Sequence, residues 1–221
     1  MSIHENLVVL ARNIPPHCTL IAVSKTQPLE KIKEAYSWGQ RVFGENRAQE
    51  MAGKHEALPR DIAWHMIGHL QTNKVKYIVS FVSLIQSVDS FKLLEEINRQ
   101  GIKVKRVIPC LLQVHIAEEE AKFGFSGQEL VDLMSSAPWK NLENIRITGL
   151  MGMATFTENE QQVRKEFRSL KTLFEQLRSG PLPESVKMEE LSMGMSGDFK
   201  IALEEGSTMV RIGTTVFGQR Q

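Results

Sequence analysis

The sequence has 221 residues, of which 42% are hydrophobic and 24% are charged, so the chain is long and apolar enough to bury a sizeable core. Its 27 Lys and Arg residues nearly balance 26 Asp and Glu residues, and the net charge of +1 argues against a broad surface for nucleic acid or anionic membranes. No run of about 18 apolar residues is present that could form a membrane-spanning helix. Any anion that the protein binds must therefore be held by a local group of residues.

The two cysteines and the N-terminal segment bear on the cellular compartment. Cys18 and Cys110 are too few for a disulfide framework and lack the spacing of metal ligands, so we interpret them as free thiols in a reducing cytoplasm. The N-terminal segment carries Glu5 early, and Arg12 interrupts its short apolar stretch. It predicts a helix that ends before Pro15 rather than a signal peptide.

Short β-rich runs alternate with helical patterns along the chain. Strands are predicted at 19–24, 41–45, 62–68, 83–88, 107–114, 145–153, 188–194 and 209–214. Helices are predicted at 28–39, 71–79, 90–101, 126–136 and 161–180. Pro28 marks a helix start, and the expected helix ends are Gly39, Gly101 and Gly180.

The repeated strand–helix unit predicts parallel strands joined by right-handed crossovers. No glycine-rich dinucleotide fingerprint occurs in the first turn, which favours a closed (β/α)8 TIM barrel over an open doubly wound sheet. We therefore expect residues 1–221 to form a single α/β domain of this kind. In such a barrel the functional groups gather at the carboxyl ends of the strands.

Lys25 is the first candidate functional residue. It follows the first predicted strand and, by the period of two, lies on the same side as Ile21 and Val23. Partial burial beside aliphatic side chains favours the neutral amine, which is the form that attacks a carbonyl carbon. Position alone leaves open the alternative that Lys25 has left the barrel and points to solvent.

The last two predicted strands end in glycine-containing turns, at 192–198 (SMGMSGD) and 211–215 (RIGTT). Glycines let backbone N–H groups approach a phosphate, hydroxyls add donors, and a following helix adds a favourable dipole. A phosphate site after strands seven and eight recurs in TIM barrels, although two ordinary loops would also fit the pattern. A reactive lysine combined with a phosphate site suggests a phosphorylated aldehyde, for which pyridoxal 5′-phosphate (PLP) is the obvious candidate.

Several longer segments make this interpretation specific. They occur in family order, cover nearly the whole chain and resemble the pyridoxal phosphate homeostasis protein family: IAVSKTQP, FGENRAQE, WHMIGHLQTNK, GLMGMA, ELSMGMSGDF and STMVRIGTTVFG. The resemblance implies the fold of the N-terminal barrel of alanine racemase, the fold type III class of PLP proteins. It also implies PLP bound as a Schiff base and a role in intracellular vitamin B6 homeostasis.

The resemblance also implies which residues bind the cofactor. Lys25 matches the PLP lysine, and Arg211 matches the arginine that faces the pyridine nitrogen. The further contacts that it implies are Asn46, after the second strand, and the phosphate ligands Ser196, Gly213 and Thr214. The period of two supports Arg211, because it shares a face with Met209 and Gly213. From the residues alone, a structural ion pair is an equal alternative for Arg211.

The arginine also bears on activity. It stays protonated and only donates, so it disfavours a protonated pyridine nitrogen and weakens the ring as an electron sink. In the alanine racemases, a tyrosine from a separate C-terminal domain supplies the second acid/base, whereas Tyr36 and Tyr77 of this sequence lie in predicted helices. We therefore expect a binding protein that lacks a complete catalytic set. We also expect no metal site, because a strand end and Gly68 separate His65 from His69.

The leading hypothesis is a cytoplasmic, monomeric PLP-binding homeostasis protein that contacts PLP-dependent apoenzymes transiently and binds neither nucleic acid nor membranes. One alternative is a PLP-dependent amino-acid racemase or deaminase that uses His69 as its second acid/base. Another is a PLP-free barrel of aldolase type that forms a Schiff base with a sugar phosphate. The charged loop 118–122 is a candidate gate of the mouth, although surface solvation explains its charges as well.

Overall fold

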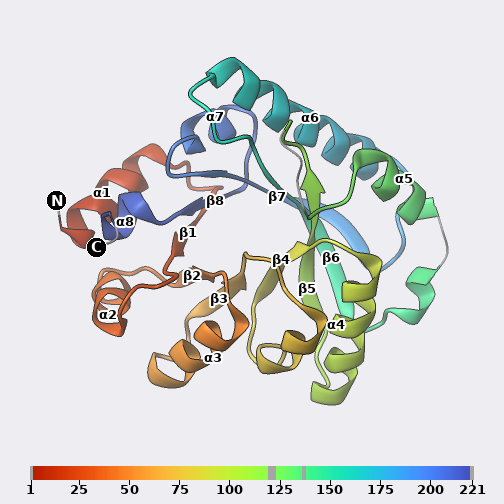
Figure 1. The fold of residues 1–221 in the computed structure, drawn as a ribbon, viewed down its shortest axis with the longest axis horizontal. Coiled ribbons are helices and arrows are strands. Elements are labelled where there is room, and N and C mark those ends of the chain that lie inside the picture. Colours follow the sequence, from red (N-terminus) through yellow and green to blue (C-terminus); the bar gives the residue numbers. More distant parts are fainter. Residues whose placement is uncertain (1, 119–122, 136–137, 220–221) are drawn as a thin grey trace.

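The computed structural model describes residues 2–118, 123–135 and 138–219. Its parallel strands form a closed barrel in which each strand pairs with the next and the last pairs with the first (Figure 1). The strands are β1 (Thr19–Val23), β2 (Val42–Glu45), β3 (Ala63–Met66), β4 (Leu84–Val88), β5 (Ile108–His115), β6 (Ile145–Met153), β7 (Val186–Met195) and β8 (Met209–Ile212). The predicted (β/α)8 TIM barrel is confirmed.

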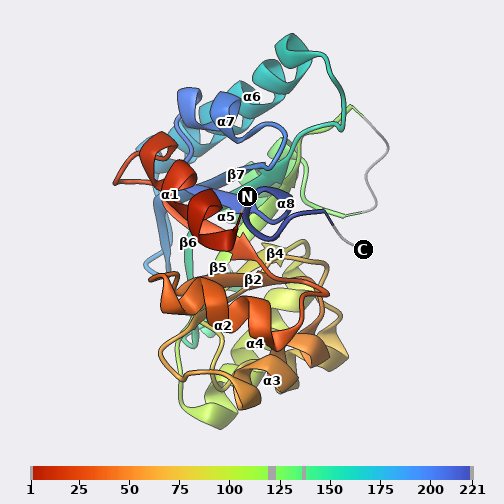
Figure 2. The same cartoon turned by 90° about the vertical axis from the view of Figure 1, so that its left-hand side faces the viewer.

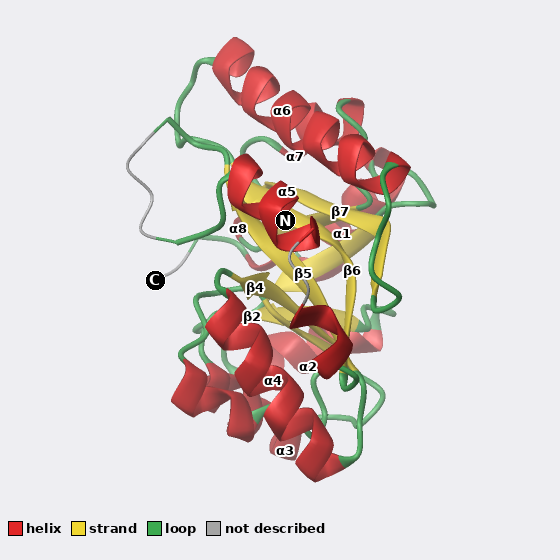
Figure 3. Cartoon of the chain, turned by 90° about the vertical axis from the view of Figure 1, so that its right-hand side faces the viewer, coloured by secondary structure: helices red, strands yellow, loops and turns green. Residues whose placement is uncertain are grey.

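Helices surround this barrel. Figure 2 shows α6 and α7 on one side of the strands and α2, α3 and α4 on the other, and Figure 3 shows the strands enclosed between these groups. The helices are α1 (Ile3–Asn13), α2 (Leu29–Ser37), α3 (Ala48–Ala57), η1 (Thr72–Tyr77), α4 (Phe91–Val104), α5 (Gly127–Ser135), η2 (Pro138–Asn141), α6 (Glu160–Ser179), α7 (Phe199–Glu204) and α8 (Thr214–Phe217), where η denotes a 3-10 helix. The N-terminal helix ends before Pro15, as predicted.

One predicted helix end is wrong, and α3, η2 and α8 were not predicted. α4 continues through Gly101 to Val104 and ends at Lys105, which adopts the left-handed conformation with φ 55°. Gly101 is needed for close packing rather than for the helix end, because a Cβ there would lie 2.9 Å from the carbonyl oxygen of Asn144. α3 lacks a clear apolar stripe, since a lysine is among its buried residues, Ala48, Met51 and Lys54.

The core has an inner and an outer part, because successive strand residues point to opposite faces. The inner cluster fills the barrel and contains Ile21, Leu84, Leu111, Met151 and Met209. The outer cluster lies between the strands and the helices and includes the large, fully buried side chains of Phe43, Trp64 and Phe167. Burial of each such side chain contributes about 1.5–3 kcal/mol to folding, so the two clusters fix which face of every strand looks inward.

Candidate cofactor site

Lys25 lies in a tight turn directly after β1, at the carboxyl end of the barrel. Its side chain is half-buried, and Ile21 and Val23 on the preceding strand are buried. The backbone N–H of Gln27 donates to the carbonyl oxygen of Ser24 at 3.0 Å and closes the turn. Thr26, inside the turn, has a φ of +63°, which is unusual for a β-branched residue. The turn thus holds Lys25, the lysine predicted from the sequence, at the mouth of the barrel.

The turn after β7 brings Ser196 to the same end of the barrel. Gly194 has a φ of +96°, and a Cβ there would lie 2.6 Å from the Cβ of Ala202, so only glycine allows this path. The Asp198 carboxylate accepts a hydrogen bond from the backbone N–H of Met195 and fixes the turn. Within the described residues, the backbone N–H of half-buried Ser196 has no protein acceptor.

The turn after β8 lies beside the strand that carries Lys25. Ile212 pairs with Ala22, and a Cβ on Gly213 would lie 3.2 Å from the carbonyl oxygen of Val23. In the described part of the chain, no protein acceptor is assigned to the backbone N–H groups of Gly213 and Thr214. Strands β7, β8 and β1 are neighbours in the barrel, so their ends place unpaired N–H donors next to the Lys25 turn.

Arg211 lies inside the barrel below these turns and is 4% exposed. Its guanidinium donates to Ser192 Oγ at 2.6 Å and to the carbonyl oxygen of Gly152 at 2.9 Å. No ion pair joins it to a carboxylate within the described ranges, so the structure does not favour the alternative of a structural ion pair. Burial lowers the pKa of Arg211 to about 10, against the opposing charge of Asp198, and the side chain remains a cation at neutral pH.

A chain of buried polar side chains continues from Arg211 across the barrel. Ser192 Oγ donates to Gln86 Oε1 at 2.7 Å, and Gln86 Nε2 lies 3.0 Å from His65 Nδ1. Because an amide nitrogen only donates, His65 accepts at Nδ1 and its ring is neutral. Ser192 and Gln86 were not predicted as site residues. The alternation of side chains along β7 was the available signal for Ser192, because it directs this side chain into the barrel, as it does Arg211 on β8.

His65 is expected to make the protein lose stability in acid. Burial lowers the pKa of its ring to about 4, whereas an unfolded histidine titrates near 6.5. Between these pH values the unfolded chain binds more protons, so stability is full above pH 6.5 and falls as the pH drops toward 4, by up to about 3 kcal/mol. His65→Gln keeps a partner for Gln86 and should flatten this acid limb in denaturant titrations at several pH values. The exposed His17→Gln is the control, and an unchanged slope in His65→Gln would contradict the prediction.

Asn46 lies two residues beyond Gly44, which pairs with Val23, so the register places it beside the Lys25 turn. Its side chain is half-buried, and no hydrogen bond to a described residue is assigned to its amide. A Cβ on Gly68, after β3, would lie 2.6 Å from the carbonyl oxygen of Asn46, so the two strand ends pack closely. Its amide is therefore available at the mouth.

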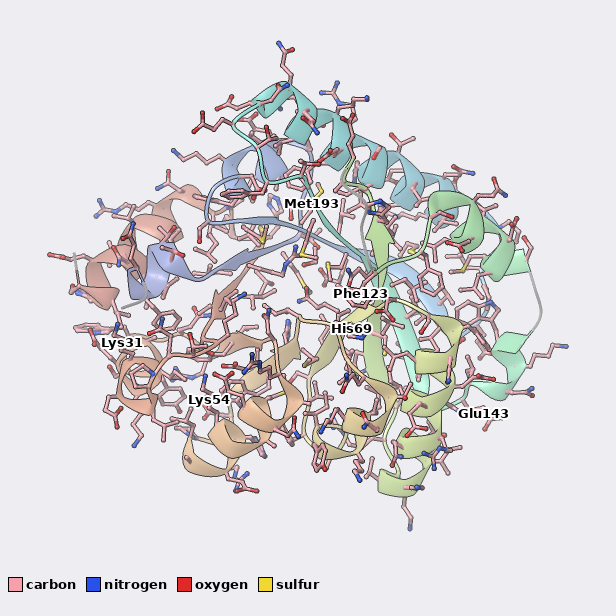
Figure 4. The ribbon with its side chains drawn as sticks, in the orientation of Figure 1. Lys31, Lys54, His69, Phe123, Glu143 and Met193 are labelled. Carbon is pink, nitrogen blue, oxygen red and sulfur yellow. The ribbon has the colours of Figure 1, made fainter. Side chains whose placement is uncertain are left out.

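His69 follows β3 at the same end of the barrel. Its Nδ1 lies 2.7 Å from Asp89 Oδ2, and its ring stacks on Phe123 with the centroids 3.9 Å apart (Figure 4). It also lines a cavity of about 410 Å³ with Asp89 and Ser90 near the start of α4. An ionised carboxylate only accepts, so Nδ1 carries a proton. Residues 119–122 of the candidate gate lie outside the described residues.

Comparisons with known proteins place the chain in a family. Residues 1–221 match the family model described as alanine racemase, N-terminal domain. A pyridoxal phosphate homeostasis protein of Aquifex aeolicus is 43% identical over 203 residues, which are 91% of this chain and 87% of that protein. The protein of the same name from Homo sapiens is 38% identical over 213 residues, which are 91% of this chain and 76% of that protein.

Solved structures agree. PipY of Synechococcus elongatus without PLP matches with a TM-score of 0.90 at 37% identity, covering 98% of this chain and 100% of PipY. PipY with PLP bound matches with a TM-score of 0.87 at 36% identity over the same shares. Alanine racemase from Bartonella henselae has a TM-score of 0.73 at 17% identity, covering 99% of this chain and 62% of that one, which shows the common barrel fold.

The fold and the family model define a barrel of the alanine racemase N-terminal class. The chain belongs, within that class, to the pyridoxal phosphate homeostasis protein family. In the described part of the chain, no helix is long and apolar enough to cross a membrane.

Proposed function

We propose that this protein binds PLP and takes part in intracellular PLP homeostasis. The observation that carries the proposal is the meeting of an amine, unpaired backbone N–H groups and a buried cation at the ends of the adjacent strands β1, β7 and β8. PLP carries an aldehyde, a phosphate and a pyridine nitrogen, and each of these groups matches one part of that set. The PLP-bound relative PipY supports the same ligand.

Each residue has a proposed role. Lys25 would hold the cofactor as a reversible Schiff base, in which its Nζ would form a C=N bond with the aldehyde carbon and one water molecule would leave. Arg211 donates to the unprotonated pyridine nitrogen from inside the barrel. Asn46 is a further contact at the mouth, and the phosphate is held by Ser196, Gly213 and Thr214.

We infer a carrier rather than a catalyst. Bound PLP is a weaker electron sink when its pyridine nitrogen is unprotonated, and a cation at that nitrogen disfavours protonation. The lysine holds the aldehyde and returns it on hydrolysis, which suits storage or delivery. We further propose that the protein is a cytoplasmic monomer whose single domain spans 1–221 and that PLP-dependent apoenzymes are its transient partners.

One observation favours a second candidate function, weak amino-acid racemase or deaminase activity. His69 is oriented by Asp89, as a general base requires, and it lies at the same end of the barrel as Lys25. Solvent-deuterium exchange at Cα of a panel of amino acids distinguishes the two functions. Exchange that is lost in His69→Gln would support the enzyme, and no exchange with any amino acid would support the carrier.

The proposed function is tested on the purified protein by an absorption spectrum before and after addition of PLP. We expect the visible band of a Schiff base, its loss on borohydride reduction, and a mass increase of one PLP-derived group. A spectrum identical to that of free PLP and no mass increase would overturn the proposal. Cleavage of a sugar phosphate by a protein that shows no such band would instead support the aldolase alternative.

A further inference from the structure

The FGENRAQE segment contains two acidic residues that the cofactor site does not use. Glu45 ends β2 on the outer face of the barrel, and Glu50 lies in the first turn of α3. One turn further, Lys54 Nζ donates to Glu45 Oε1 at 2.8 Å and to Glu50 Oε1 at 2.7 Å. Figure 4 shows Lys54 on α3, outside the ring of strands. These three side chains form an acid–lysine cluster between the barrel wall and α3.

The acid–lysine cluster holds both chain neighbours of Lys25. On one side, Lys54 Nζ donates to the carbonyl oxygen of Ser24 at 2.7 Å, and Ser24 Oγ donates to Glu45 Oε1 at 2.6 Å. On the other side, the backbone N–H of Thr26 donates to Glu50 Oε1 at 2.6 Å. The backbone that carries Lys25 is thus anchored on either side by side chains from β2 and α3.

Such an anchor is needed because the turn is strained. Thr26 is β-branched and has a φ of +63°, a left-handed conformation that such residues avoid when nothing holds them. The hydrogen bond from the Thr26 N–H to Glu50 favours the left-handed conformation of Thr26 over an extended one. The Thr26 hydroxyl adds a hydrogen bond to the carbonyl oxygen of Lys25 at 2.6 Å, so the strained residue also orients the lysine backbone.

Stability alone does not account for the cluster. The side chains of Lys54 and Glu45 are 8% and 0% exposed, and a buried ion pair adds little net stability over apolar residues of the same size. Glu45 Oε2 is buried without a partner among the described residues, and burial raises the pKa of this carboxyl. Burial also acts to raise the pKa of Glu50, but hydrogen bonds from Lys54 and Thr26 hold it below its ordinary value, which keeps Glu50 ionised.

We propose that Glu50, held by Lys54, is a positioning residue that fixes the Thr26 turn and thereby aligns Lys25 for attack on the PLP aldehyde. The inference rests on the proposed function, because it deepens the role of Lys25. Misplacement of a reacting group by about 1 Å slows a reaction by as much as a hundredfold, so a loosened turn should slow Schiff-base formation. It should leave the binding of the phosphate and the ring nearly intact, since those contacts come from β7 and β8.

The experiment compares bond formation with binding in the full-length protein. Stopped-flow absorbance gives the rate of Schiff-base formation with PLP, and titration with pyridoxine 5′-phosphate, which has an alcohol in place of the aldehyde, gives binding without bond formation. Glu50→Gln and Glu50→Ala should slow bond formation about tenfold and change analogue affinity less than about threefold. Met51→Ala is the control, because it makes a cavity in the core face of the same helix without touching the turn; it should lower the melting temperature but not the rate.

A second substitution tests the reason for the effect. Thr26→Gly adopts the left-handed conformation without help but lacks the hydroxyl that donates to the Lys25 carbonyl, so in the Glu50→Gln background it should restore part of the rate. Equal losses in rate and analogue affinity, or an unchanged rate in both Glu50 variants, would overturn the positioning role. Failure of the unmodified protein to form a Schiff base, with analogue binding retained, would instead contradict the proposed function of Lys25.

Discussion

Lys25→Ala is expected to abolish the borohydride-trapped PLP adduct while the barrel stays folded. The side chain is half-buried and lies beyond the end of β1, so its truncation should lower the free energy of unfolding by about 1 kcal/mol, which leaves the barrel folded. The phosphate turns and Arg211 remain, so PLP should still bind, but without the covalent bond its Kd should rise at least tenfold, which is about 1.4 kcal/mol. Mass spectrometry after reduction measures the adduct, and thermal unfolding checks the fold.

A matched control for Lys25→Ala is Lys31→Ala. Lys31 lies in the first turn of α2, and its Nζ donates to the carbonyl oxygen of Phe217, the last residue of α8, at 3.3 Å (Figure 4). This variant should retain the full adduct. An undiminished adduct in Lys25→Ala would show that another amine binds PLP, and peptide mapping of the reduced protein would then identify it.

Most of the fold could be predicted because hydrophobic periodicity is a local signal. The run 145–153 coincides with β6, and the amphipathic pattern at 161–180 differs from α6 by one residue at each end. Gly101 was misassigned because a glycine near the end of a helical pattern normally terminates it. A glycine is required at this position because Asn144 packs closely against it. That contact joins segments far apart in the chain, so the local sequence does not indicate it.

The site could be predicted in part for the same reason. The period of two places Lys25 and Arg211 on inward faces, and glycine-containing turns mark the ends of β7 and β8. Hydrogen bonds between distant segments could not be predicted: Ser192 meets Gln86 across 106 positions, and Lys54 meets the Ser24 carbonyl across 30. These polar contacts depend on how the barrel closes, which no single segment of the sequence encodes.

Arg211 illustrates a conflict between stability and binding. Burial lowers its pKa to about 10, so the charged form is unfavourable inside the barrel. Its two hydrogen bonds go to neutral groups, Ser192 Oγ and the Gly152 carbonyl, and no carboxylate in the described ranges pairs with it. A buried cation of this kind is unfavourable in the ligand-free protein, so its presence is explained by what it does for the ligand.

Arg211→Met should therefore separate the two properties. We expect the ligand-free protein to melt at the same temperature or a few degrees higher, because an apolar side chain of similar length removes the buried charge and Ser192 keeps Gln86 as its partner. PLP binding should weaken by about 2 kcal/mol, roughly thirtyfold in Kd, because the hydrogen bond from a charged group to the pyridine nitrogen is lost. Thermal unfolding without ligand and PLP titration measure the two effects, and Arg99→Met, on an exposed face of α4, is the control. A lower melting temperature with unchanged affinity would show that Arg211 serves the barrel and not the cofactor.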